Sequence, residues 1–147
     1  MICIQAPESI TNIVALQQTS FYLAGGLSTN WRDELISKVD APVTIYNPFR
    51  KDFGGTSEHQ AIWEYMYLRR ATYVIFWFCA ESYCPMSLYE LGCVSQNKKL
   101  IIGIEDGYRK ANEITQQMQI SRLDVTVFQA DQTTGMNYFA NYIKENA

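Results

Sequence analysis

The sequence has little histidine and no closely paired cysteines. Its 147 residues include one histidine, His59, and four cysteines, Cys3, Cys79, Cys84 and Cys93, without a C-x-x-C spacing. Zinc sites use clusters of these residues at short spacings, so we expect no metal centre. A Ser-His-Asp or Cys-His mechanism would depend on His59 alone, which disfavours that class of enzyme. Free and mostly buried thiols in a reducing compartment are the expected state of the cysteines.

Charged residues and long apolar runs are also scarce. Charged residues make up 18% of the chain, the net charge is −3, and the basic pairs are scattered without forming a continuous basic tract. Nucleic acid is therefore not an expected partner. No segment approaches the length that crosses a bilayer, and the N-terminus lacks a basic leader followed by a long apolar run. We expect a cytoplasmic protein that does not bind membranes.

Apolar and aromatic residues, by contrast, are abundant. They account for 48% and 14% of the chain respectively, which predicts a packed globule and excludes disorder. A chain of this length fits one domain over residues 1–147, which would bury roughly 70% of the surface of the unfolded chain. The ten tyrosines and three tryptophans exceed what such a core usually hides. Some of them are expected to line a pocket or a subunit interface.

Strand signals alternate with helix signals along the chain. Apolar runs that predict strands begin at Ser20, Val43, Thr72, Leu100 and Val125. Helical patterns follow, with a start at Asn30 and with helices over 57–70 and 87–98. This alternation predicts an α/β fold, a Rossmann-like or flavodoxin-like three-layer sandwich with a five-stranded parallel sheet in the order 2-1-3-4-5. The first residues, MICIQ, can add a small edge strand.

Two side chains are predicted to face each other in this fold. The strands at Ser20 and Thr72 are neighbours whose connections leave to opposite sides, which makes their carboxyl ends a ligand-binding switch point. Tyr22 and Glu90 then lie on the two lips of one crevice. Ser87 and Glu90 fit an S-x-x-E capping box, in which case Glu90 only ties off a helix. Alternatively, Glu90 is held ionised at the helix start and attacks the anomeric carbon of a sugar.

Further polar and small residues follow the predicted strands. Gly25 and Gly26 form a tight turn that allows backbone N–H groups to approach a phosphate or sugar, without the G-x-G-x-x-G pattern of dinucleotide enzymes. Asn47 and Arg50 follow the second strand, either as a solvated turn or as ligands of a sugar hydroxyl or phosphate. Trp77 and its neighbour close the central strand; one is expected in the core, and the other can stack on a base.

Seven segments carry a likeness to a known family. In order, they are IQAPESI, FYLAGG, NPFRKDF, IWEYMYLRRA, VIFWF, CPMSLYELG and LIIGIEDGYRK. Their order and spacing resemble the nucleoside 2-deoxyribosyltransferase-like family up to about Gln117, and FWF followed by CP-x-S-L-Y-E-L-G is the most specific part. The resemblance implies a Rossmann-like fold and cleavage of the N-glycosidic bond of a (deoxy)nucleoside or nucleotide, with transfer of the sugar to another base or to water.

The resemblance also implies roles for individual residues. Glu90 is the nucleophile that carries the sugar and Tyr22 orients it, without a metal or organic cofactor. The motif positions near the sugar and base are Gly25, Gly26, Asn47, Arg50, Glu64 and Trp77. Glu64 has a simpler interpretation as a solvated residue on a helix face. Family members often complete the pocket across a subunit interface, so we expect a homodimer or larger homo-oligomer that binds a nucleoside or nucleotide.

One departure from the family pattern concerns the acid that protonates the leaving base. Family members usually carry an aspartate where this chain has Thr72, and the well-studied transferases carry another where it has Cys84. Glu81, or a carboxylate of a neighbouring subunit, can substitute. Two other functions stay open. One is a non-catalytic binding module for a nucleotide or nucleotide-derived signal, with the chemistry lost at Thr72; the other is a flavodoxin-like or oxidoreductase domain.

Overall fold

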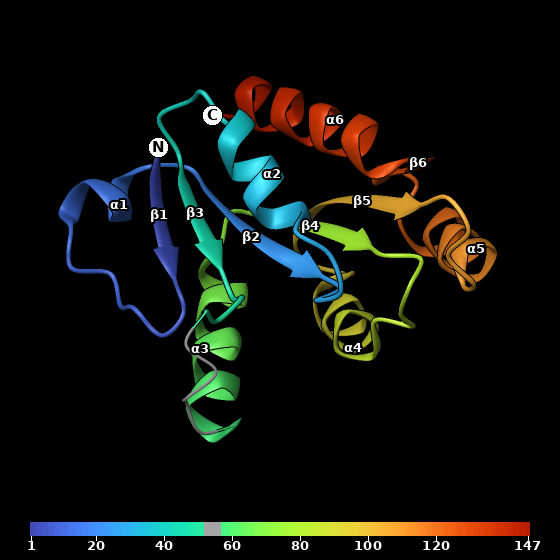
Figure 1. The fold of residues 1–147 in the computed structure, drawn as a ribbon, viewed down its shortest axis with the longest axis horizontal. Helices are drawn as coiled ribbons and strands as arrows, with labels where there is room; N and C mark the ends of the chain where they lie inside the picture. Colours follow the sequence, from blue (N-terminus) through green and yellow to red (C-terminus); the bar gives the residue numbers. More distant parts are fainter. Residues whose placement is uncertain (52–56) are drawn as a thin grey trace.

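The computed structural model describes residues 1–51 and 57–147 and contains a parallel sheet with helices on both faces (Figure 1). The strands of the described residues are β1 Ile2–Gln5, β2 Ser20–Gly25, β3 Thr44–Asn47, β4 Tyr73–Phe78, β5 Lys99–Glu105 and β6 Thr126–Ala130. The helices are α1 Ile13–Gln17, α2 Trp31–Lys38, α3 Ser57–Arg70, α4 Pro85–Val94, α5 Ala111–Ser121 and α6 Gln132–Glu145. The sheet has six strands in the order β1-β3-β2-β4-β5-β6.

The predicted α/β class and the relative order of the five predicted strands are confirmed, but the strand number was wrong. The sixth strand is β1, in the MICIQ segment that can add an edge strand, and it pairs in parallel with β3 from Ile2 opposite Thr44 to Gln5 opposite Asn47. Its first N–H donates to the carbonyl of Val43 at 2.9 Å. As a short edge strand with mostly half-buried residues, β1 carries only a weak apolar signal in the sequence.

The helices divide between the two faces of the sheet. Figure 1 shows α2 and α6 together on one side, and α3 and α4 on the other. The chain leaves β2 through α2 toward β3, and it leaves β4 through α4 toward β5 in the opposite direction. Because β2 and β4 are neighbours, with Gly25 opposite Trp77, the direction of the connections reverses between them. This is the topological switch point where open parallel sheets bind ligands.

Strand β4 lies at the centre of the core, and its side chains alternate between the two faces. Phe76 and Phe78 stack on one face with ring centroids 5.9 Å apart. On the other face Trp77 meets Phe139 of α6 edge-on at 6.0 Å and is fully buried. Its ring fits because Gly103 and Gly135 lack side chains: a Cβ at either position would lie within 2.7 Å of a ring carbon. Trp77 is thus a core residue of the α6 face.

Candidate active site

The site begins with Tyr22 and Glu90, which lie on the face of the sheet covered by α3 and α4. Tyr22 is fully buried in β2, and α4, which carries the half-buried Glu90, packs on this strand. Burial, followed by the charge of Glu90, raises the pKa of Tyr22 well above its usual value. The phenol lies close enough to lower the pKa of the carboxyl in return. Yet neither Tyr22 Oη nor Glu90 Oε2 completes a hydrogen bond of good geometry with a described residue, although both atoms are buried.

Such unpaired atoms are unusual in a folded protein. Buried polar atoms nearly always have a hydrogen-bond partner, because leaving one unpaired costs roughly 1–3 kcal/mol. In this protein two of them, a donor and an acceptor, belong to neighbouring side chains at the switch point. A polar ligand that enters between α3, α4 and β2 would satisfy both. The pair is therefore the centre of the candidate site.

Glu64 of α3 brings a second carboxylate to this centre. It is half-buried and accepts a hydrogen bond of 3.0 Å from Gln60 Nε2, which also donates to the carbonyl of Pro48 at 2.8 Å. Burial, and next the negative charge of Glu64, raise the pKa of Glu90 to about 7. With this raised pKa, Glu90 is partly protonated near neutral pH.

Arg32 is a buried cation beside the same groups, and the sequence interpretation missed it. Its guanidinium donates to the carbonyls of Leu23 at 3.1 and 3.2 Å, Gly25 at 3.0 Å and Gly26 at 2.8 Å. Its charge lowers the pKa of Glu90 and of Tyr22, while burial lowers its own pKa to about 10. Its position in the sequence carries a signal of this burial. Arg32 lies three residues before Leu35 and therefore on the same, buried face of α2.

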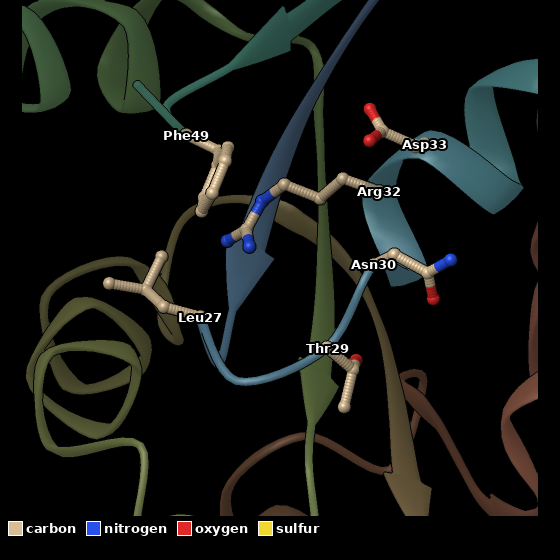
Figure 2. Close-up of a pocket in the computed structure, with 6 residues that line it drawn as sticks. All are labelled: Leu27, Thr29, Asn30, Arg32, Asp33 and Phe49. Carbon is tan, nitrogen blue, oxygen red and sulfur yellow. The ribbon is translucent and has the colours of Figure 1, made fainter. Parts of the chain in front are cut away.

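A cavity of about 270 Å³ opens beside this guanidinium. Its lining residues are Leu27, Thr29, Asn30, Arg32, Asp33 and Phe49. Figure 2 shows Leu27 and Phe49 on two sides of the Arg32 guanidinium, one from the β2–α2 connection and the other from the segment after β3. Two apolar side chains around one cation form the mixed lining that small-molecule sites use.

The start of α4 differs from the predicted capping box. The helix begins with Pro85 as its first residue and Cys84 as its N-cap, so that Ser87 lies inside the first turn and is buried. Proline is favoured at this position because the first N–H of a helix has no partner to lose. Glu90 consequently lies in the second turn, where burial raises its pKa rather than the helix start lowering it. Because α4 runs back over the sheet from this edge, Glu90 comes to lie near Tyr22.

The glycine turn forms the end of β2 and is packed tightly. Gly25 has a φ of +155°, and a Cβ there would lie 2.4 Å from the carbonyl oxygen of Trp77. The N–H of Gly26 donates to that same oxygen at 3.1 Å, and the carbonyls of both glycines accept from Arg32. These backbone groups are thus bonded inside the protein, and the structure gives the glycines a packing role at the base of the site.

The remaining predicted binding residues do not all meet. Asn47 is buried at the end of β3, where its Oδ1 accepts from the N–H of Phe49 at 3.1 Å and shapes the turn that carries the cavity-lining phenylalanine. Arg50 is half-buried, just before the end of the first described range. Trp77 faces α6, on the other side of the sheet from Glu90. The structure therefore joins Glu64, but not Trp77, to the Tyr22 and Glu90 pair.

Thr72 and Cys84, the two positions without the family aspartates, are both hydrogen-bonded inside the protein. Thr72 lies at the amino end of β4, and its N–H and hydroxyl bond to Ser20. Cys84 packs against Cys79, and Glu81 is exposed in the connection between β4 and α4. The carboxylate that acts on Glu90 is Glu64. A second carboxyl group is thus present beside Glu90, on α3.

Two searches across the described residues bear on metals and membranes. Within 1–51 and 57–147, no three histidine, cysteine or acidic side chains gather as a set that could hold a metal ion. In the same ranges no helix has the length and apolarity needed to span a bilayer.

The fold and site together define a class of protein. A parallel α/β sheet with polar side chains gathered at its switch point is the arrangement in which such sheets bind small ligands. The family model described as nucleoside 2-deoxyribosyltransferase like matches residues 18–108. This is more than half of the chain, so the protein belongs to that family, whose description indicates nucleoside glycosyl transfer. The match includes Tyr22, Arg32, Glu64 and Glu90. No curated protein matches the chain.

Proposed function

We propose that this protein cleaves the N-glycosidic bond of a (deoxy)nucleoside or nucleotide and transfers the sugar, through a covalent ester on Glu90, to another base or to water. The observation that carries the proposal is the buried, unpaired Glu90 Oε2, surrounded by Tyr22, Glu64 and Arg32. Family membership supports the reaction class.

In the first step Glu90 acts as the nucleophile. Its carboxylate oxygen attacks the anomeric carbon while the bond from that carbon to the base nitrogen breaks, through a transition state with oxocarbenium character. The electron pair of the broken bond leaves with the base. Only the ionised carboxylate can attack, and the Arg32 cation favours that form. On substrate binding the Tyr22 hydroxyl donates to Glu90 and keeps the attacking oxygen in place.

Glu64 is the group that we assign to proton transfer. A departing base takes up a proton, and an acid that supplies it accelerates the step by about 10²–10⁴. In this assignment Glu64 donates the proton to the departing base as Glu90 attacks. In the second step Glu64 takes a proton from water or from the incoming base, which then attacks the anomeric carbon and releases Glu90.

The cavity between Leu27 and Phe49 is the proposed place of the base. Its apolar walls suit a flat heteroaromatic ring, and the cavity is also lined by Arg32, whose charge acts on Glu90. No metal or organic cofactor is part of the proposed mechanism.

We include a homodimer or larger homo-oligomer in the proposal. Large apolar side chains are exposed on the outer faces of α3 and α4, namely Ile62, Tyr65, Met66, Met86 and Tyr89. These helices also carry Glu64 and Glu90, so a second copy bound there would border the site. Analytical ultracentrifugation of the protein and of a Tyr65→Glu, Tyr89→Glu double variant tests this part; a monomeric wild type would contradict it.

The decisive experiment is an assay for release of free base. Deoxynucleosides, ribonucleosides and their monophosphates are incubated with the wild type and with Glu90→Ala, and the products are separated by chromatography. Intact-mass spectrometry of the same mixtures should show a sugar-sized adduct on the wild type that is absent from the variant. Failure of the wild type to release base from any member of the panel would contradict the proposal.

The alternative, a non-catalytic binding module, rested on the threonine at position 72. The N–H of Thr72 bonds to Ser20 at the amino end of the sheet, and Glu64 supplies a second carboxyl group beside Glu90, which favours the enzyme over the binding module. Calorimetric binding of a nucleotide without turnover, unchanged in Glu90→Gln, would nevertheless establish the alternative.

A further inference from the structure

Two cysteine side chains meet beneath the glycine turn of the site. Cys79 directly follows β4, and Cys84 is the N-cap of α4. A Cβ at Gly26 would lie 2.9 Å from Cys79 Sγ and 3.0 Å from Cys84 Sγ, so the two sulfurs lie within about 6 Å of each other. The Cys84 thiol also donates to the carbonyl of Cys79 at 3.8 Å. Both thiols are free, buried and separated by only four residues.

The backbone at Cys84 is unusual and holds the thiol in this position. With φ 51° and ψ 55° it is left-handed, a conformation that costs a residue with a side chain about 1–3 kcal/mol. The N–H of Cys84 bonds to Ser82 Oγ at 3.0 Å, and its thiol contacts the Ser82 carbonyl at 3.7 Å. Residues 80–83 are thereby folded so that the flanking Cys79 and Cys84 place their sulfur atoms close together beneath Gly26.

The surroundings favour the reactive form of one thiol. Hydrogen bonding from Cys79, with a smaller contribution from the Arg32 charge, lowers the pKa of Cys84 to about 7. Thiolates at helix starts and near cations are the ones that oxidants attack. Cys84 is also the slightly more accessible of the two, with 3% of its surface exposed against 0% for Cys79.

We propose that Cys79 and Cys84 form a reversible modification site at which a hydroperoxide closes an intramolecular disulfide. The Cys84 thiolate attacks a peroxide oxygen and becomes a sulfenic acid, while the O–O bond breaks and the other oxygen leaves as hydroxide or alkoxide. The Cys79 sulfur then attacks the Cys84 sulfur, and water leaves with the proton of the Cys79 thiol. Two thiols lose two electrons and the peroxide gains them.

The disulfide would alter the candidate active site through two contacts. Bonded sulfurs lie only about 2.05 Å apart, so both side chains must shift beneath Gly26. Thr29, which lines the cavity, contacts Cys79 Sγ at 3.7 Å, and α4, which carries Glu90, begins at Cys84. We expect oxidation to slow glycosidic cleavage; this consequence, unlike the disulfide itself, rests on the proposed function.

The test uses a Cys3→Ser, Cys93→Ser background that retains only the two cysteines of the site. The folded protein is treated with hydrogen peroxide, quenched, alkylated in denaturant and mapped by mass spectrometry. The expected result is joint loss of both thiols, a cross-linked peptide that joins residues 79 and 84 within one chain, and recovery of both thiols with dithiothreitol. Persistence of the thiols, overoxidation without a cross-link, or cross-links only between chains would overturn the proposal.

Cys79→Ser and Cys84→Ser on the same background are the matched controls. With Cys79 replaced, the reaction should stop at a sulfenic acid on Cys84 that a sulfenate-specific probe captures; equal or faster oxidation of Cys79 in the other variant would contradict the assigned order. Circular dichroism checks that each variant folds. If the wild type proves inactive on nucleosides, the cross-link still decides the redox proposal, which separates its failure from that of the proposed function.

Discussion

Two polar pairs lie two residues apart along β2 and differ in how their hydrogen bonds are used. At the amino end, the N–H groups of Ser20 and Thr72 each donate to the hydroxyl of the other residue, at 3.3 and 3.0 Å. At Tyr22, the buried hydroxyl and the Glu90 oxygen beside it have no such partners. The first pair is complete and ties β2 to β4. The second leaves hydrogen-bonding capacity that a ligand can use, which is what separates a site from a structural contact.

The largest expected effect is that of Glu90→Gln. The variant loses the nucleophile and should reduce kcat by about 10⁴-fold or more, as removal of a covalent nucleophile does elsewhere. The Glu90→Gln variant should be no less stable than the wild type. Because burial raises the pKa of Glu90 from 4.5 to about 7, its charged form weakens the fold, and the melting temperature of the variant relative to the wild type should rise as pH increases through this window.

The measurement is steady-state release of base together with thermal melting between pH 4 and pH 9. Glu58→Gln on the exposed surface of α3 is the matched control and should behave as the wild type. If Glu90→Gln retained more than a tenth of the activity, Glu90 could not be the nucleophile.

Glu64→Gln should produce the next largest effect. Loss of the acid should lower kcat by about 10²–10³-fold with natural bases. At the same time Glu90 loses a neighbouring negative charge that raises its pKa, so the rise of activity with pH, which we expect near 7 in the wild type, should move to lower pH. The pH profiles of the two proteins test both parts, and a substrate with a leaving group that needs no protonation should restore much of the rate. A profile displaced to higher pH would contradict the carboxylate pair.

Arg32→Lys should have a smaller effect on rate and a clear one on stability. A lysine ammonium cannot reach the three carbonyls that the guanidinium bridges, so the free energy of unfolding should fall by about 1–3 kcal/mol. A displaced or weaker cation stabilises the Glu90 anion less, so the pH profile should move upward, opposite to Glu64→Gln. Urea unfolding and the profile measure the two effects, and an unchanged profile would show that Arg32 acts only on the fold.

How far the sequence predicts this structure depends on the kind of signal. The order of the five strands follows from alternation and crossover rules, and this topology also brought Tyr22 toward Glu90. The face occupied by Trp77 was not predictable, because a strand buried on both sides has no polar alternation to orient it. The start of α4 was missed because the capping pattern outweighed Pro85. Arg32 was missed because a buried charge is recognised only through the carbonyls that surround it.

The smallest expected effect, and the sharpest test of the comparison, is that of Thr72. If the family aspartate is needed for proton transfer, Thr72→Asp should raise activity; if Glu64 has that role, it should not. We expect no gain in kcat and a loss of about 1 kcal/mol in stability, because the substitution removes the hydroxyl that exchanges hydrogen bonds with Ser20. Thr72→Val, which removes the same hydroxyl without adding charge, should show a similar loss of stability and unchanged turnover. A tenfold gain of activity in Thr72→Asp alone would show that an acid at position 72 takes part in proton transfer. It would contradict the assignment of that role to Glu64.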